Sequence, residues 1–100
     1  MATTLKSLAR GAFATSSGTL YTVPASTTAI VTNITICNAT ASNQTFNLSF
    51  QGSEVFYESS LLPNQTAVID MKQTLATANI ITGYASSTSV KYHISGAEIA

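Results

Sequence analysis

The sequence predicts an all-β protein, a seven- to eight-stranded antiparallel β-sandwich of jelly-roll type. Apolar and polar residues alternate in several short segments, most strictly between Thr45 and Phe50, and side chains alternate across a strand in this way. Turn-forming residues separate these segments at spacings of about 8–12 residues, as in sandwiches and small barrels. After residue 18 no segment has the apolar period of a helix, which excludes folds built from alternating strands and helices.

The composition indicates one small domain whose surface is covered by partners. The chain has 100 residues and a mass of 10.4 kDa, which is large enough to fold without metals or disulfides. Only 8% of the residues are charged and the formal net charge is zero, whereas about 25% are charged in an ordinary soluble domain. Soluble monomers usually keep a net charge away from zero. We therefore expect a homo-oligomer or a larger assembly; a stable monomer with a hydroxyl-rich surface is the alternative.

The same counts exclude several classes of partner. Four basic residues spread along the chain do not make the basic patch that phosphate binding requires, so we expect no nucleic-acid partner. No apolar run approaches the roughly 20 residues of a membrane-spanning helix, and we expect no membrane partner. Residues 1–14 lack the continuous apolar stretch of a signal peptide. The single cysteine, Cys37, allows no internal disulfide.

Residues 1–18 differ from the remainder and are expected to form an extended or partly helical N-terminal arm, with the β-sandwich domain at 19–100. Apolar residues at positions i, i+3, i+4 and i+7, counted from Leu5, have the spacing of an amphipathic helix. Gly11 and the Ser-Ser-Gly that follows the segment weigh against a long helix.

We expect this arm to bind a neighbouring subunit or another protein. Its apolar side chains would be the anchors, and two basic residues at i, i+4 lie on the flank. The alternatives are a frayed terminus without a role and a mitochondrial transit peptide, which the segment resembles only in being basic, hydroxylated and free of acids. The predicted partner-binding residues are Leu5, Lys6, Leu8, Arg10 and Phe13.

The first strand of the expected sandwich is Thr19–Val23, which ends at Pro24 because proline cannot donate to a strand ladder. A hairpin at residues 29–50 then organises the fold, with a small polar loop between its two strands. The residues expected on the core face of this hairpin are Ile30, Ile34 and Ile36 in one strand and Phe46, Leu48 and Phe50 in the other.

The remaining strands are expected at Glu54–Glu58, Thr66–Lys72, Asn79–Ala85 and Thr88–Ser95, and a brief pairing at Glu98–Ile99 would make an eighth. Their alternation assigns the core faces. Val68 and Asp70 point to the side opposite Ile69 and Met71, whereas Val90, Tyr92 and Ile94 face the core.

No catalytic, cofactor-binding or metal-ligating constellation is expected. His93 is the single histidine and Cys37 the single cysteine, so the usual zinc ligands are lacking. Asp70 and His93 could supply two members of a Ser-His-Asp arrangement, but no Gly-x-Ser-x-Gly segment accompanies them. No charged residue lies within ten positions of Cys37, whereas a reactive thiolate needs an electropositive setting. The sequence therefore predicts a protein that is not an enzyme and has no cofactor.

Other polar and aromatic patterns have structural explanations. Glu54 and Glu58 would lie about 13 Å apart along a strand, too far for paired glycosidase carboxylates, and are either solvated or receive Lys6 and Arg10 of a neighbouring arm. Four tyrosines are expected at the core rim or at an interface, with carbohydrate stacking as the alternative. Asn-x-Ser/Thr is a glycosylation signal in secreted proteins, but outward-facing strand residues produce the same spacing. It occurs at Asn33, Asn38, Asn43, Asn47 and Asn64.

Four segments carry a likeness to a known group of proteins: Leu-Tyr-Thr-Val-Pro-Ala at 20–25, Thr-Ala-Ile-Val-Thr-Asn-Ile-Thr-Ile-Cys-Asn at 28–38, Ile-Ile-Thr-Gly at 80–83 and His-Ile-Ser-Gly-Ala-Glu-Ile at 93–99. They resemble the small β-sandwich virion proteins of tailed bacteriophages. The likeness covers about residues 18–99 and leaves the arm outside it.

This resemblance implies a virion structural protein without catalytic residues. Such proteins serve as capsid decoration (cement) subunits or as tail and fibre components, and a cement protein that stabilises the shell is the leading expectation. The alternatives are a tail, baseplate or fibre-adaptor subunit and a carbohydrate-binding module. The expected partners are further copies of the chain, as a homotrimer by analogy, and the major capsid protein or tail proteins. The expected location is the virion, on the capsid surface or tail, after assembly in the bacterial cytoplasm.

Overall fold

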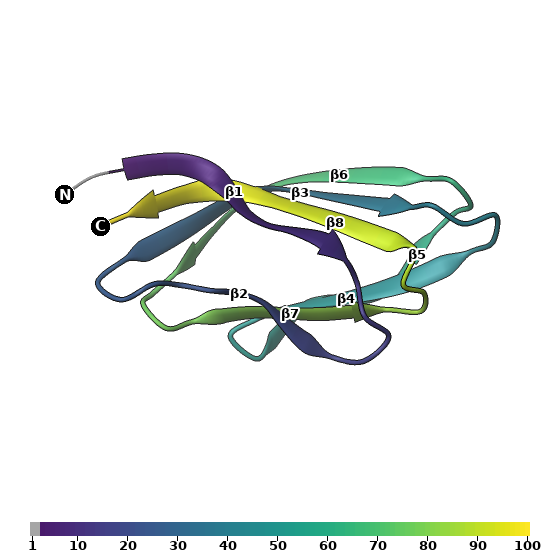
Figure 1. Cartoon of the computed structure of the whole chain (residues 1–100), viewed down its shortest axis with the longest axis horizontal. Helices are drawn as coiled ribbons and strands as arrows, with labels where there is room; N and C mark the ends of the chain where they lie inside the picture. The colour runs from purple at the N-terminus through teal and green to yellow at the C-terminus, as the bar shows by residue number, and fades with distance from the viewer. Residues whose placement is uncertain (1–2) are drawn as a thin grey trace.

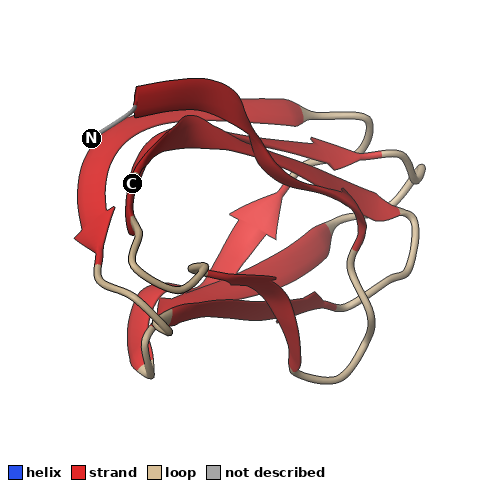
Figure 2. Ribbon diagram, turned by 60° about the vertical axis from the view of Figure 1, so that its left-hand side comes forward, coloured by secondary structure: helices blue, strands red, loops and turns tan. Residues whose placement is uncertain are grey.

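Strands and the loops between them make up the whole described chain (Figures 1 and 2). The computed structural model describes residues 3–100. Nowhere in this range is there a helix long and apolar enough to cross a membrane. The eight strands are β1 (Thr3–Ala12), β2 (Gly18–Thr22), β3 (Thr28–Asn38), β4 (Gln44–Phe50), β5 (Ser53–Leu61), β6 (Thr66–Leu75), β7 (Ile80–Ala85) and β8 (Val90–Ile99).

The strands form two four-stranded antiparallel sheets that face each other, as the sequence predicts. The hairpin expected at residues 29–50 is wrong, because β3 belongs to one sheet and β4 to the other, and their apolar faces meet across the core instead of lying side by side. The first sheet has the order β1-β8-β3-β6 and the second the order β2-β7-β4-β5. The chain is therefore paired from its ends towards its middle, β1 with β8, β2 with β7, β3 with β6 and β4 with β5. This is the strand order of an eight-stranded jelly roll.

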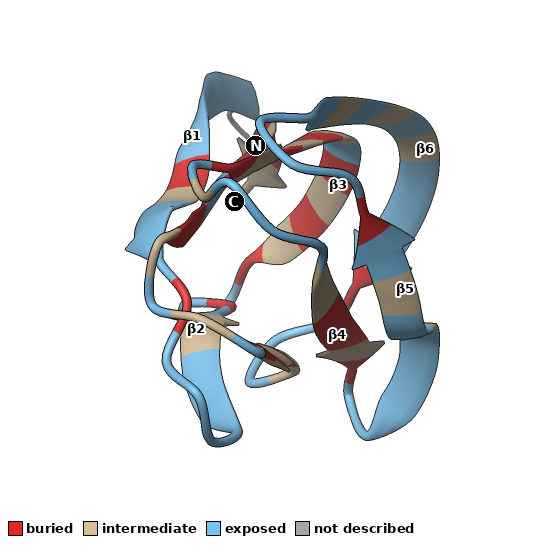
Figure 3. Cartoon of the chain, turned by 90° about the vertical axis from the view of Figure 1, so that its right-hand side faces the viewer, coloured by how far each residue is buried: buried red, intermediate tan, exposed pale blue. Residues whose placement is uncertain are grey.

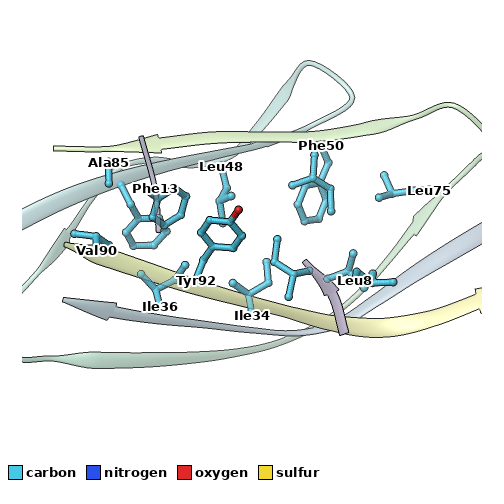
Figure 4. Packing of buried hydrophobic residues seen from close by; sticks show 14 of the residues in the cluster. Leu8, Phe13, Ile34, Ile36, Leu48, Phe50, Leu75, Ala85, Val90 and Tyr92 are labelled. Atoms are coloured by element: carbon cyan, nitrogen blue, oxygen red, sulfur yellow. The ribbon is translucent and has the colours of Figure 1, made fainter. Parts of the chain in front are cut away.

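The core lies between the two sheets and is built from the inward side chains of both (Figure 4). The expected core residues Phe46, Leu48 and Phe50 of β4 are buried, as are Val90, Tyr92 and Ile94 of β8. Phe13, in the loop after β1, packs with its ring centroid 4.8 Å from that of Tyr92 and 6.3 Å from that of Phe46. Aromatic rings at such separations contribute to stability beyond the area they bury.

A β-bulge in β3 changes which residues of that strand face the core. Thr32 is an extra residue relative to β8, so the side-chain alternation changes phase there. As a result Val31 is fully buried together with Ile34 and Ile36, whereas Ile30 is only half-buried. The expectation that Ile30 shares the core face is therefore wrong, because the alternation was continued through a bulge.

The N-terminal segment is a strand, and the helical character expected for it is wrong. Residues Thr3–Ala12 pair antiparallel with β8, with one extra residue, Leu8, at a bulge. The bulge directs Leu8 into the core while Leu5 remains exposed, so an apolar spacing that imitates a helix arises on a strand. Leu8 and Phe13 belong to the same hydrophobic core as the rest of the sandwich. Residues 1 and 2 of the expected arm lie outside the described residues.

The C-terminal pairing also differs in detail. Glu98–Ile99 is the end of β8 and not a separate strand; β1 is the additional strand of the first sheet. Between β1 and β3, Gly96 of β8 permits a very close approach: a Cβ atom there would lie 1.9 Å from the carbonyl oxygen of Ile30. Only glycine fits this point of the sheet without a shift of the neighbouring backbone.

Asn38 at the end of β3 is completely buried and joins two loops. Its side-chain NH₂ donates to the carbonyl oxygens of Ser42, at 2.9 Å, and Leu62, at 3.0 Å. Its side-chain oxygen accepts from the backbone N–H of Thr40, at 3.1 Å, and from the Thr40 hydroxyl, at 2.7 Å. The amide thus uses its full hydrogen-bonding capacity, which compensates for its burial.

Candidate interaction surfaces

The five predicted partner-binding residues separate into two groups. Leu8 and Phe13 are buried in the chain's own core and offer no surface to a partner in this conformation. Leu5 is 82% exposed, and Lys6 and Arg10 are exposed as well. The structure therefore leaves one apolar and two basic side chains of the predicted set exposed on β1. Their role in binding a partner stays a prediction.

A polar cluster of Lys6, Tyr21 and Glu98 connects β1 and β8 of the first sheet with β2 of the second. Lys6 of β1 donates a hydrogen bond to Glu98 of β8 at 3.1 Å, and the Tyr21 hydroxyl of β2 donates to the other carboxylate oxygen. The Tyr21 hydrogen bond lowers the pKa of Glu98, Lys6 lowers it further, and partial burial opposes both. Burial, followed by the hydrogen bond and charge of Glu98, raises the pKa of Tyr21. Tyr21 and Glu98 come from opposite sheets, so the pair closes the sandwich at this side.

The basic side chains gather on the strands at one edge of the first sheet. Arg10 of β1 lies directly opposite His93 of β8 in the strand register, and Lys91 follows two residues away on the same face. All three are exposed. We use the name basic edge for the exposed residues of β1 and β8, namely Leu5, Lys6, Arg10, Lys91 and His93.

The acidic side chains gather at the opposite side of the sandwich, on β5 and β6. Each of these strands is the last of its sheet, and Figure 3 shows them near each other at one side, with β1 and β2 at the other. Both strands also expose large apolar side chains, of which Tyr57 is 66% and Val68 64% exposed. We use the name acidic edge for Glu54, Val55, Tyr57, Glu58, Val68 and Asp70.

Bulges in β5 produce this exposure. Successive residues of a regular strand point to opposite faces, yet Tyr57 and Glu58 are both exposed. The register to β4 shifts at this point and Glu58 has a positive φ of 47°. Asn47 of β4 accepts a hydrogen bond from the Glu58 backbone N–H at 2.9 Å and is itself buried. The expectation that Asn47 faces solvent is therefore wrong, because its amide holds the bulge.

The charges of the whole molecule divide between these two edges. All eight charged residues lie on β1, β5, β6 and β8. β1 and β8 together carry three basic residues and one acidic one, a net charge of +2, whereas β5 and β6 carry three acidic residues and one basic one, Lys72, a net charge of −2. The chain as a whole is therefore neutral, but it carries two edges of opposite net charge.

Part of the acidic edge could be predicted from the sequence. Val68 and Asp70 were expected to share the side opposite Ile69 and Met71, and the burial pattern of β6 confirms this. Glu54 and Glu58 were expected as a receiving surface. The placement of β5 and β6 as the last strands of two facing sheets was not predicted, because the residue pattern does not specify the order of strands.

The residues considered for catalysis lie apart. Asp70 on β6 and His93 on β8 are separated by β3, and Asp70 accepts a hydrogen bond from Asn33 at 3.0 Å. Cys37 is a half-buried free thiol. Within residues 3–100 there is neither a pocket nor a group of three or more His, Cys, Asp or Glu side chains that could hold a metal ion.

The tyrosines and the glycosylation signals also occupy different environments. Tyr57 is largely exposed, Tyr21 and Tyr84 are half-buried, and Tyr92 is in the core, so they do not form one aromatic platform. Of the five signal asparagines, Asn38 and Asn47 are buried and committed to hydrogen bonds.

Comparison with known proteins supports the fold. No family model and no curated protein matches the chain. Among solved structures, a chain in "Structure of infectious bursal disease virus Gx strain" superposes over 97% of this chain with a TM-score of 0.52 and 9% sequence identity. This chain spans about 30% of the length of that one. The likeness shows a shared all-β fold.

Proposed function

We propose that this protein is a non-enzymatic structural protein of a virion, and specifically a capsid decoration protein of a tailed bacteriophage. The observation that carries the proposal is the eight-stranded jelly-roll order, together with the superposition of nearly the whole chain on part of a chain from a virus structure. Jelly rolls of this kind are frequent in viral capsids. The phage assignment rests on the resemblance of the segments at 20–25 and 28–38.

The distribution of polar and charged residues supports a structural role in an assembly. The surface has few charges, and those present are sorted onto two edges where contacts with other subunits can use them. A decoration protein needs a rigid body and repeated contacts, because many weak contacts on one shell add up through avidity. The proposed partners are other copies of the chain, as a homotrimer, and the major capsid protein.

Immunogold electron microscopy of purified virions from the source tests this assignment. An antibody against the protein should label the capsid surface. Label confined to the tail would transfer the function to a tail, baseplate or fibre-adaptor subunit with the same fold. Particles that contain the gene but carry no label anywhere would overturn the virion assignment.

A further inference from the structure

We propose that the basic edge of one copy binds the acidic edge of a second copy, so that the protein assembles head to tail. This inference deepens the proposed function, since it supplies the contact by which the homo-oligomer forms. The partner of each edge is a second copy of this chain, because the two edges have opposite net charges and both expose apolar side chains.

Charge is the first reason. A net charge of +2 on β1 and β8 faces a net charge of −2 on β5 and β6. Opposite edges in contact bring the basic side chains of β1 and β8 towards the acidic side chains of β5 and β6, whereas two like edges in contact would place equal charges together, at a cost. Charge therefore favours a contact between different edges over a two-fold symmetric contact between identical ones.

Apolar surface is the second reason. The most exposed large apolar side chain of the described chain is Leu5 on the basic edge, and Tyr57 and Val68 are exposed on the acidic edge. Stable interfaces combine an apolar centre with a polar rim, and tyrosine is enriched in them. Leu5 against Tyr57 and Val68 gives such a centre, with the charged residues of both edges around it.

Strand direction is the third reason. Neighbouring strands of the first sheet are antiparallel throughout, so β1 and β6 run in opposite directions. If successive copies are related by a rotation about an axis parallel to the strands, the β1 of the next copy lies antiparallel to β6, the arrangement of every strand pair inside the protein. The bulge at Leu8 limits backbone pairing along β1, so side chains carry most of the contact. A head-to-tail contact closes into a ring when successive rotations add up to a full turn.

Two variants block one edge each. Leu5→Asp with Arg10→Glu changes the net charge of β1 and β8 from +2 to −1, and Tyr57→Ser with Val68→Ser removes the exposed apolar surface of the acidic edge without changing its charge. All four positions are exposed, so the variants should fold, which circular dichroism and thermal unfolding verify. Thr88→Asp, in the exposed loop between β7 and β8, is the matched control.

Analytical ultracentrifugation gives the masses. We expect the wild type and Thr88→Asp to form the same oligomer, each edge variant to be a monomer of 10.4 kDa, and a mixture of the two edge variants to form a complex of twice the monomer mass. The mixture stops at two chains because its two remaining edges are both acidic.

The outcomes that overturn the proposal are equally definite. A wild type that is monomeric at every concentration, or an edge variant that keeps the wild-type mass, removes the contact. A mixture that stays monomeric shows that the edges do not bind each other, and dissociation of Thr88→Asp shows a non-specific effect of charge. These masses are independent of particle labelling, so a failed virion assignment and a failed interface are distinguished.

Discussion

At several positions of this protein, tertiary contacts and not the secondary-structure propensity of the segment determine which residue fits. Gly96 is required by the carbonyl of Ile30, and Asn38 is required by two loops that its amide joins. Neither requirement is visible in the sequence, where Gly96 resembles a break in β8 and Asn38 the start of a polar loop. Both depend on residues far away in the chain, which only the folded sheets bring into contact.

Gly96→Ala should strongly destabilise the protein. The added Cβ would meet backbone atoms of Ile30, which cannot move without disturbing the pairing of β3 with β8. Inserting a methyl group into a packed site typically costs about 1–3 kcal/mol, and we expect the upper end of this range in urea unfolding. Gly18→Ala is the control, because nothing lies within 4 Å of its added Cβ, and it should leave the unfolding midpoint nearly unchanged. Equal midpoints for the two variants would contradict the close approach.

The Tyr21–Glu98 pair predicts a dependence of stability on pH. A carboxyl with a lowered folded-state pKa stabilises the fold above its unfolded value, about 4.3, and this contribution is lost as the pH falls through the folded pKa. A phenol with a raised pKa stabilises the fold below its unfolded value, about 10, and this contribution is lost as the pH rises beyond it. The wild type should therefore exceed Tyr21→Phe in unfolding free energy most clearly near neutral pH.

Urea unfolding across the pH range, for both proteins, measures this difference. The difference in unfolding free energy between the wild type and Tyr21→Phe should decrease at acidic pH and again at alkaline pH. Tyr84→Phe is the matched control, since this tyrosine of β7 is also half-buried and takes no part in the Tyr21–Glu98 pair. A gap between wild type and Tyr21→Phe that stays constant at all pH values would show that the hydroxyl acts by packing alone.

At the scale of elements, the strand conformation of β1 explains why Leu5 and Leu8 of the N-terminal segment differ in burial. Its edge position gives it one neighbour, β8, and the bulge at Leu8 turns one side chain into the core. A freely moving arm would bury neither Leu5 nor Leu8, and a helix would place both on one face. The strand buries one and exposes the other, which makes the two leucines a matched pair.

Leu8→Ala should cost about 2–4 kcal/mol of unfolding free energy, because it leaves a cavity in the core. Leu5→Ala should change it by less than about 0.5 kcal/mol, since surface substitutions away from special features do little. Chemical denaturation in the background of the variant substituted at Tyr57 and Val68, which keeps both leucines, avoids any effect of association. If both substitutions were equally mild, β1 would not be part of the cooperative fold.

Much of the element pattern could be predicted from alternation, and the bulges account for most of what could not. The first half of β8 alternates regularly and its core residues were predicted correctly, as were Phe46, Leu48 and Phe50 of β4, where Asn47 is buried as well. In β1 and β3 an extra residue changes the phase, so Leu8 imitated a helix position and Ile30 replaced Val31 as the expected core residue. A bulge has no fixed sequence signal, because the pairing of neighbouring strands creates it. Of the candidate surface, the exposed residues of β1 and the acids of β5 were expected, and their opposite placement was not.

At the scale of the whole molecule, the separation of charge follows from the topology. Four strands about 4.8 Å apart place the outer strands of a sheet about 14 Å from each other, which exceeds the Debye length of about 10 Å at 0.1 M salt. The charges of β1 and those of β6 in one copy are therefore largely screened from each other in solution. Between two copies in contact the same charges approach to a few ångströms, where screening is weak, so opposite edges attract across an interface more than within the chain.

Self-association should consequently weaken as salt is added. Raising the ionic strength from about 0.05 M to about 0.5 M shortens the Debye length from about 14 Å to about 4 Å, and reduces the attraction between charged edges. Sedimentation of the wild type at the two salt concentrations should show a shift from oligomer towards monomer, whereas the apolar contact of Leu5 with Tyr57 and Val68 alone would be unchanged or strengthened by salt. An oligomer that is equally stable or more stable at high salt would mean that apolar burial, and not charge, joins the copies.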